Sequence, residues 1–577
     1  MEQNKKRNIL RVAVFMATIL CTLWCSYIVG RIVERSHVKH VLATMSANVD
    51  EYEASLEQVA RDMATMEQIV SGNDKLMQTI LAVQNNYVDP IALDTLYEKA
   101  IPKLLSELDP HSEYIPAKMF DVVNESLEGE FDGIGIVFNA MTDTILVLNV
   151  IPQGPSDKAG VRAGDRIIRI DGRDVAGQGL RQDSMVRLMR GPRGSKVKLS
   201  VQRAAMEELV DINITRAAIE VHSVTAAFML DKSAGIGYLR LAQFSRTSHA
   251  EICSAMERLK GEGMKSIIID LRGNGGGFLD QVVNILNEFL ERGKLIVYTE
   301  DRYGRRIDEF SNGTGRYTDT KVAVLVDEIS ASSSEILAGA IQDNDRGLVI
   351  GRRTFGKGLV QAQIPFSDGS AMRLTVARYY IPSGRSIQRP YTNGDEMSYH
   401  MDLVNRINHH ELFSKDSIHL DKSKKYYTAT GRVVYGGGGV MPDIFIPVDT
   451  TTVSDFYKKV WDANILYRYT LDYTDDNRAK LDKVTTVEEL DTVFDDEAIL
   501  KDFLAYAEHH GVTATAEDIA TSREVLLTQI RAYIGRNALN DESGYYYNIY
   551  PIDARGKDIY RTRPCRRFGV KTTRTEC

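Results

Sequence analysis

Short apolar runs, each followed by a turn and a helical pattern, mark the middle of the chain. Residues 267–271 form a mostly apolar run that predicts a buried strand, and glycines follow at positions 275–277. The next segment has the spacing of one helical face, at Val282, Val283, Leu286 and Leu290. The same order returns downstream, with a strand at 322–326, a turn at 327–332 and a helix from about residue 333. These repeated units predict an α/β core.

The pattern differs on either side of this core. Apolar alternation with turn glycines, as in AGVRAGDRIIRIDG, predicts a β-rich domain over residues 128–216. Helical patterns dominate 71–127 and 451–577, and the charge-rich segment 31–70 predicts an exposed helical stalk. A polar insertion spans about 391–430. The chain, with 577 residues, is therefore expected to form several domains.

Ser332 and Lys357 are the strongest candidates for chemistry. Ser332 stands at a predicted helix start, and Lys357 lies in a glycine turn that opens an apolar strand. A lysine amine can take the proton of a serine hydroxyl if the amine is neutral. Lowering a lysine pKa from about 10.4 to about 7 costs roughly 4.6 kcal/mol, which burial can supply. Gln361, four residues later, can orient the amine without adding a negative charge.

Structural alternatives exist for both segments. Ser332 through Glu335 is also S-x-x-E ahead of an apolar run, the pattern of a capping box. Gly351 through Lys357 matches most of the phosphate-binding pattern G-x-x-x-x-G-K. Gly358 then replaces the required Ser or Thr, and a strand follows where that motif needs a helix, so nucleotide binding is not favoured.

The glycine-rich turn supplies a place for a developing negative charge. Backbone amides at Gly275 and Gly276, beside a helix N-terminus, can stabilise an oxyanion. The amide of Ser333, at the second helix start, is a further candidate donor.

The strings DLRGNGGG, SASSSEI and FGKGLVQ, in this order and spacing, resemble the carboxyl-terminal processing, or tail-specific, serine peptidases. The resemblance implies Ser332 as nucleophile, Lys357 as general base and Gln361 as the group that positions the lysine. Glu335 matches a residue that supports the site in some relatives. Ser333 stands where these enzymes often have alanine, and Gly275 where many have proline. Neither departure removes a required group, but Ser333 is a second serine that makes the choice of nucleophile less automatic.

The β-rich segment resembles a PDZ domain. Its peptide-binding loop would be Gly133, Ile134, Gly135 and Ile136, whose amides can hold a terminal carboxylate while a strand edge accepts the peptide. Apolar tails suit a groove beside the two isoleucines. Arg190 matches a position suited to coupling peptide binding to the active site, and it also fits a cation at a helix C-terminus before Gly191.

The N-terminus predicts an anchor. Basic residues precede nineteen uncharged residues from Val12 to Gly30, a length close to a membrane helix, with no small-residue cleavage site after it. The basic flank, residues 1–11, favours a cytoplasmic N-terminus. We expect a single-pass protein of a bacterial cytoplasmic membrane with its catalytic part on the periplasmic side.

Net charge and histidine spacing argue against nucleic-acid binding and against a zinc-protease motif. The net charge of -8 gives no sign of a nucleic-acid partner. His409, His410 and Glu411 lack the second histidine of the zinc-protease motif, because Ser414 occupies its place. The sequence predicts neither a metal nor another cofactor. Cys565 and Cys577, both in the basic C-terminal tail, could form a disulfide, but the sequence does not establish one.

The resemblance implies a multidomain α/β protein with a crotonase/ClpP-like ββα protease core and an inserted PDZ domain. The expected order is a basic flank, an anchor at 12–30, the stalk, an N-terminal helical region, the PDZ domain, a protease core at 217–450 and a C-terminal helical region.

The predicted function is a membrane-anchored serine endopeptidase that captures and cuts protein C-terminal tails, with a homo-oligomer as an open option. One alternative is an inert PDZ scaffold of the cell envelope that only binds peptides. Another is a Ser-His-Asp triad with His249 or His222 as base, which is disfavoured because no G-x-S-x-G turn occurs.

Overall fold

The computed structural model describes residues 75–139, 144–151, 153–162, 164–203, 206, 208–419, 421–539 and 542–546. The predicted anchor, the stalk and the basic tail with its two cysteines lie outside these residues. Among the described helices, none is long and apolar enough to span a membrane.

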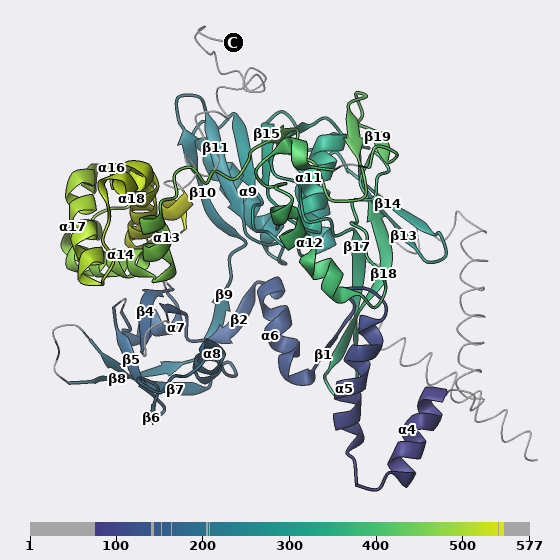
Figure 1. The fold of residues 1–577 in the computed structure, drawn as a ribbon, viewed down its shortest axis with the longest axis horizontal. Helices are drawn as coiled ribbons and strands as arrows, with labels where there is room; N and C mark the ends of the chain where they lie inside the picture. Colours follow the sequence, from purple (N-terminus) through teal and green to yellow (C-terminus); the bar gives the residue numbers. More distant parts are fainter. Residues whose placement is uncertain are drawn as a thin grey trace, which may run out of the picture. The chain divides into compact units, whose positions relative to one another are not determined.

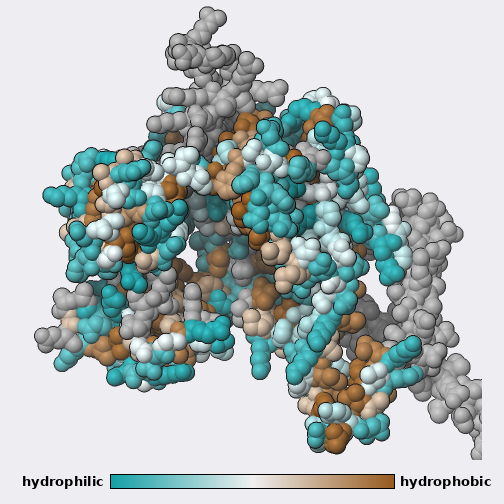
Figure 2. Space-filling view, viewed as in Figure 1, coloured by the Kyte–Doolittle hydropathy of each residue, from teal (hydrophilic) through white to brown (hydrophobic). Residues whose placement is uncertain are grey.

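The chain divides into two units, residues 1–99 and residues 100–577. The described part of the first contains α4 (Lys75–Asn86) and the start of α5 (Leu93–Ser106). No residue of α4 is buried, and Figure 2 shows hydrophobic side chains gathered over this helix. The exposed large apolar side chains of this stretch are Leu76, Met77, Leu81, Tyr87, Val88 and Ile91.

The main α/β core of the second unit is built on a six-stranded sheet of order β10-β11-β12-β15-β16-β21 (Figure 1). Only β10 and β11 pair antiparallel; the other neighbours are parallel. The strands are β10 (Val224–Asp231), β11 (Ile236–Leu241), β12 (Ser266–Asp270), β15 (Lys321–Val326), β16 (Gly347–Gly351) and β21 (Ile444–Phe445). Helices α9 (Ser248–Gly261), α10 (Leu279–Asn287) and α11 (Ser333–Asp343) contribute side chains to the main hydrophobic core with this sheet.

A second sheet brings distant segments of the chain together. Its order is β1-β18-β13-β14, and β17 also pairs with β18. The strands are β1 (Glu113–Ile115), β13 (Leu295–Asp301), β14 (Arg306–Phe310), β17 (Leu359–Pro365) and β18 (Ala371–Tyr380). Because β1 precedes the segment 128–216 and pairs with β18, a stretch of the N-terminal region becomes part of the second sheet. That region also holds α6 (Ala117–Glu128), so it combines helices with the strand β1 and is not purely helical as predicted.

The PDZ segment forms its own sheet and core. The sheet runs β3-β4-β5-β7-β8, and β6 also pairs with β5. Its elements are β3 (Ile136–Asn139), β4 (Ile145–Val150), α7 (Pro155–Ala159), β5 (Arg166–Ile170), β6 (Arg173–Asp174), α8 (Gln182–Met189), β7 (Lys196–Gln202) and β8 (Val210–Thr215). A two-stranded ribbon of β2 (Glu130–Gly133) and β9 (Ala217–Glu220) carries the chain into and out of the domain.

The polar insertion is more ordered than its composition suggests. It contains α12 (Glu396–Asn408), a short helix η1 (Lys415–Ser417) and a hairpin of β19 (Lys425–Tyr427) with β20 (Val433–Tyr435). Tyr399 and Arg406 of α12 are 3% and 4% exposed. The histidines of this stretch, His400, His409, His410 and His419, are exposed, whereas the opposite face of α12 is buried.

The C-terminal region is helical, as expected. It comprises α13 (Asp455–Asp462), α14 (Ile465–Asp476), α15 (Arg478–Leu481), α16 (Val487–Val493), α17 (Asp496–His509) and α18 (Ala516–Leu539), around a separate core. Val487, Leu539 and Tyr546 pack with side chains of the six-stranded sheet in a further cluster. One role of this region is thus to cover the sheet.

Candidate active site

Ser332 occupies a strained turn at the start of α11. The strand β15 ends at Val326, and Ser332 caps the helix with φ 54° and ψ −116°. A non-glycine residue in this conformation costs of order 1–3 kcal/mol and persists only where its surroundings hold it. The turn places Ser332 on the wall of an open cavity that Lys357 also lines.

The neighbouring serines are engaged elsewhere. The hydroxyls of Ser330 and Ser333 donate to the carbonyls of Leu271 and Gly277, each at 2.8 Å. The hydroxyl of Ser334 donates to the Asn274 carbonyl at 3.0 Å. Ser333 is also 1% exposed, so the geometry favours Ser332 as the nucleophile. The engaged hydroxyls fasten the start of α11 to the strand β12 and its glycine turn.

Lys357 has the environment that a lysine base needs. Burial lowers its pKa, and the charge of Arg373 lowers it further, whereas Glu113, Glu335 and Asp109 act in the opposite direction. Its Nζ donates to Oε1 of Gln361 at 3.0 Å, so a neutral amide orients the amine, as predicted for this residue type.

Gln361 is in turn held by the N-terminal region. Its Nε2 donates to the backbone carbonyl of His111, a residue that the sequence analysis did not select. The Asp109 carboxylate accepts from the backbone amides of His111 and Ser112 at 2.9 and 3.1 Å. Burial, followed by the Lys357 charge, lowers the pKa of His111 to about 4, so this ring is neutral at neutral pH. The only local signal for these residues was the polar run DPHS ahead of an apolar strand.

Glu335 connects the nucleophile turn to the lysine turn. Its Oε2 accepts from the backbone amides of Ser332 at 3.0 Å and Lys357 at 2.8 Å. Its Oε1 accepts from the Gly356 amide at 2.7 Å and from the Thr354 hydroxyl. Complete burial raises the pKa of Glu335 to about 7, although the four donors stabilise its ionised form. The S-x-x-E pattern is thus a helix cap and an active-site support at once.

Tyr379 makes a second connection, which the sequence did not reveal. Its buried hydroxyl lies 3.1 Å from the Ser332 carbonyl and also contacts the Lys357 carbonyl. The two candidate residues are therefore joined through their backbones on both sides, by a carboxylate and by a phenol.

The glycine-rich turn lies directly against the nucleophile. A Cβ added to Gly276 would stand 2.7 Å from the Ser332 Cβ and 2.8 Å from the Ala331 carbonyl. Gly275, Gly276 and Ser333 all line the cavity. In this structure the Gly276 amide donates to Oδ1 of Asn274 at 2.8 Å. The amides of Gly275 and Ser333 are accordingly the better candidate oxyanion donors.

The cavity measures about 1480 Å³, more than the roughly 300–1,000 Å³ of typical small-molecule sites, and is large enough for a polypeptide. It also borders Arg190, the C-cap residue of α8. The Arg190 guanidinium pairs with Glu125 of α6 and lies 4.5 Å from the centroid of the Phe131 ring. It therefore acts both as a helix cap and as a link between the PDZ domain and α6.

The candidate peptide loop, Gly133 to Ile136, connects β2 to β3. Ile134 is 3% exposed and belongs to the PDZ core, so its side chain does not face a groove as expected. Its carbonyl accepts from the Ser156 amide at 2.9 Å. Gly135 adopts φ 74°, which suits glycine. Ile136 is partly buried against the same core.

The histidine alternatives lie elsewhere. No histidine is among the described residues that line the cavity. His249 contacts Glu288, and His222 is an exposed neighbour of Glu251. In the insertion, Glu411 receives hydrogen bonds from Arg353 and Arg406, which gives it a structural role.

Family profiles match three segments. Peptidase family S41 matches residues 235–397, the PDZ domain matches 133–214, and a family of unknown function, DUF8443, matches 456–540. The carboxy-terminal-processing protease of Bartonella bacilliformis is 40% identical over 311 residues, covering 53% of this chain and 70% of that protein. The chain belongs to peptidase family S41, the carboxyl-terminal processing peptidases.

Other S41 relatives give the same result. The carboxy-terminal processing protease CtpB of Bacillus subtilis is 32% identical over 317 residues, covering 55% of this chain and 65% of that protein. Among solved structures, the photosystem II D1 C-terminal processing protease is 28% identical, with a TM-score of 0.34, and covers 64% of this chain and 92% of its own. The family profiles show that this S41 peptidase contains a PDZ segment as well as a peptidase segment.

Proposed function

We propose that this S41 peptidase is a membrane-anchored endopeptidase that cuts proteins in or near their C-terminal tails with a Ser332–Lys357 pair. The single observation that carries the proposal is the partly buried Lys357 amine, held by Gln361 and tied to Ser332 through Glu335. The proposal includes a crotonase/ClpP-like core, in keeping with the strand–turn–helix units β12-α10 and β15-α11.

In the proposed mechanism, neutral Lys357 removes the proton of the Ser332 hydroxyl as its oxygen attacks the scissile carbonyl. The amides of Gly275 and Ser333 stabilise the negative charge on the carbonyl oxygen. The protonated lysine then donates to the leaving amine, and an acyl-enzyme remains on Ser332. Lys357 next deprotonates a water molecule that attacks the ester, and the released serine regains its proton.

Substrate capture is assigned to the PDZ domain. The backbone of residues 133–136 would hold the terminal carboxylate of a substrate, and the edge of β3 would pair with the tail. Since Ile134 is committed to the PDZ core, preference for apolar tails would arise from other side chains along this edge.

The anchor at 12–30 would keep the catalytic part at the outer face of the cytoplasmic membrane. A homo-oligomer is the second part of this assignment, because α4 exposes a row of apolar side chains that a second copy can cover. Replacing Leu76, Met77 and Leu81 with serine should then lower the mass measured by light scattering. An unchanged mass would contradict assembly through α4.

Digestion of a loosely folded protein with an apolar C-terminus tests the function. The full-length chain should produce fragments that mass spectrometry identifies, and Ser332→Ala and Lys357→Ala should not. Ser333→Ala is the matched control and should retain cleavage. Activity in Lys357→Ala would disprove the assigned base, and tail binding by the parent without cleavage would favour the scaffold function.

A further inference from the structure

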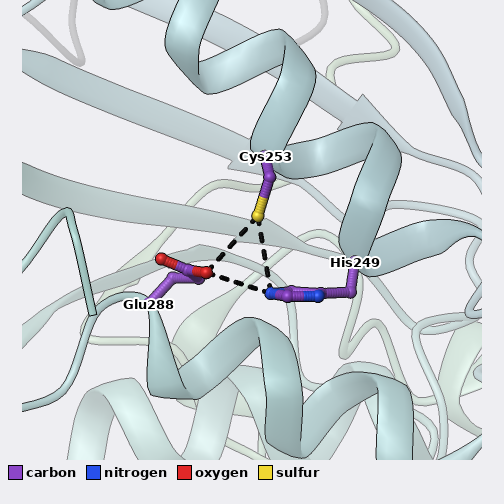
Figure 3. Close-up of side chains that lie close together, drawn as sticks. All are labelled: His249, Cys253 and Glu288. Carbon is purple, nitrogen blue, oxygen red and sulfur yellow. Dashed lines mark hydrogen bonds and ion pairs between the residues drawn. The ribbon is translucent and has the colours of Figure 1, made fainter. Parts of the chain in front are cut away.

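A second cluster of reactive side chains lies outside the catalytic cavity, between α9 and the end of α10. His249 and Cys253 are four residues apart on α9, which places them on the same helical face. Glu288 caps the C-terminus of α10. Figure 3 shows the three side chains pointing toward one another.

The three donor atoms are close together. The His249 Nε2 lies 3.0 Å from Oε1 of Glu288, and the Cys253 Sγ lies 3.4 Å from each of those two atoms. Tetrahedral zinc with bonds of about 2.0–2.3 Å to nitrogen, oxygen and sulfur separates its ligand atoms by roughly 3.3–3.6 Å. Each observed edge is within about 0.3 Å of this triangle, so small side-chain rotations bring the three atoms to one ion.

The surroundings provide the remaining requirements of a metal site. Arg316 donates to Oε2 of Glu288 from its Nε and its backbone amide, each at 3.2 Å, which orients the carboxylate and leaves Oε1 toward the cluster. The Nη2 of Arg316 also lies 3.2 Å from Oε1 of Glu288. This hydrogen bond would have to lengthen when Oε1 binds the metal. The Arg316 charge is balanced by Glu257. The imidazole is 35% exposed, so water can reach the fourth position.

The charges of the cluster also favour a divalent cation. Glu288 and Glu257 carry two negative charges, Arg316 carries one positive charge, and a metal-bound thiolate adds one negative charge. A dication bound to the thiolate would therefore make the group neutral. A donor set of nitrogen, sulfur and one carboxylate oxygen suits zinc better than magnesium or calcium, which prefer oxygen ligands.

We propose that His249, Cys253 and Glu288 bind Zn²⁺, with water as the fourth ligand, at a site separate from Ser332 and Lys357. Binding exchanges the thiol proton for the metal and connects α9 to the end of α10. The beginning of α10 follows the glycine turn that borders Ser332. The metal therefore acts as a structural clip behind that turn and takes no part in peptide cleavage.

The test is metal binding by the purified full-length chain, with Zn²⁺ titrated against a chelator of known affinity. The parent should bind one equivalent that Cys253→Ser and His249→Gln each weaken by more than about 100-fold, because losing a ligand costs more than losing its supporting hydrogen bond. His400→Ala is the matched control. His400 also pairs with a glutamate, Glu396 at 3.1 Å, but on an exposed helix surface, and its loss should leave the stoichiometry unchanged.

Cobalt and thermal unfolding supply independent readouts. Co²⁺ bound to the parent should show a thiolate-to-cobalt charge-transfer band that Cys253→Ser lacks, and Zn²⁺ should raise the melting temperature of the parent but not of either variant. If Cys253→Ser fails to fold, His249→Gln retains the thiol and still tests the site. Equal zinc binding by the parent and both variants, or a parent without the cobalt band, would overturn the proposal.

Discussion

Replacing Glu335 with glutamine removes one acceptor oxygen from the centre of the active site. The carboxylate accepts four hydrogen bonds, two on each oxygen, from Ser332, Lys357, Gly356 and Thr354. A carboxamide has one acceptor oxygen, so two bonds are lost and its NH2 group faces backbone N–H groups. Bonds to a charged acceptor contribute about 1.5–3 kcal/mol each, so the substitution removes roughly 3–6 kcal/mol of interaction.

Part of this loss should appear in catalysis. At about 1.4 kcal/mol per tenfold in rate, full expression would slow the reaction by about 10²–10⁴-fold. Because the two turns also keep the Tyr379 connection, we expect the lower end, about 100-fold in kcat, with KM nearly unchanged. Steady-state cleavage of a quenched fluorescent peptide measures both constants. Glu328→Gln is the matched control and should leave kcat nearly unchanged. Glu328 lies in the same turn as Ser332, but its carboxylate pairs with Arg352 at 2.6 Å.

The pH dependence of kcat distinguishes the loss of the Glu335 carboxylate from a general loss of packing in the variant. Burial raises the pKa of Glu335 to about 7, and only its ionised form accepts all four bonds. In the proposed mechanism the neutral form of Lys357 is the active one, so protonation of either group lowers activity as pH falls. The Glu335 charge raises the lysine pKa, against the larger effect of burial. The variant should therefore show one ionisation instead of two, shifted to lower pH.

Activity falls as pH falls, whereas the contribution of Glu335 to folding stability should fall as pH rises. The folded state holds the Glu335 proton more tightly than the unfolded chain, whose pKa is near the ordinary 4.5. The stabilisation is therefore complete below about pH 4.5 and is lost as pH rises through about 7. Glu335→Gln should lack this decline. A variant with kcat within about threefold of the parent, or with both ionisations intact, would refute the role assigned to Glu335.

Three further predictions concern Tyr379, Gly276 and the Arg190–Glu125 pair. Tyr379→Phe removes the hydroxyl that donates to the Lys357 carbonyl, at a cost of about 1–3 kcal/mol, whereas the Ser332 carbonyl keeps the amides of Glu335 and Ile336 as donors. The substitution should lower kcat about tenfold in steady-state assays, and an unchanged kcat would contradict it. Gly276→Ala forces a Cβ to 2.7 Å from the Ser332 Cβ at a backbone φ of 102° and should reduce cleavage more than about 100-fold while circular dichroism stays unchanged. Arg190→Ala and Glu125→Gln, combined in a double-mutant cycle of thermal unfolding, should show about 1 kcal/mol of coupling, and additive effects would argue against this link.

The local elements of the core were predictable because their signals are local. The apolar run at 322–326 appears as β15 (Lys321–Val326), and the expected helix begins at Ser333. The run at 267–271 appears as β12, shifted by one residue to Ser266–Asp270. In each case an apolar run sets the strand, and a glycine turn or a capping residue sets where the helix begins.

The supporting contacts of the site could not be read from the chain. The hydrogen bond from Gln361 to His111 joins residues 250 positions apart. Tyr379 lies in a strand whose aromatic residues look alike in sequence, and only the tertiary fold selects it. The zinc cluster combines an i,i+4 pair on one helix with a glutamate 35 residues beyond Cys253, a spacing that matches no short metal motif.

The contribution of the N-terminal region follows from these long-range contacts. β1 adds to the edge of the second sheet at β18, and β18 carries Tyr379. The carbonyl of His111, two residues before β1, fixes the amide that orients Lys357. Because the His111 ring stays neutral above about pH 4, this region adds an oriented acceptor beside the lysine without adding a positive charge. A protease core without residues 109–115 would keep Ser332 and Lys357 but would leave the Gln361 amide without the bond that fixes its orientation.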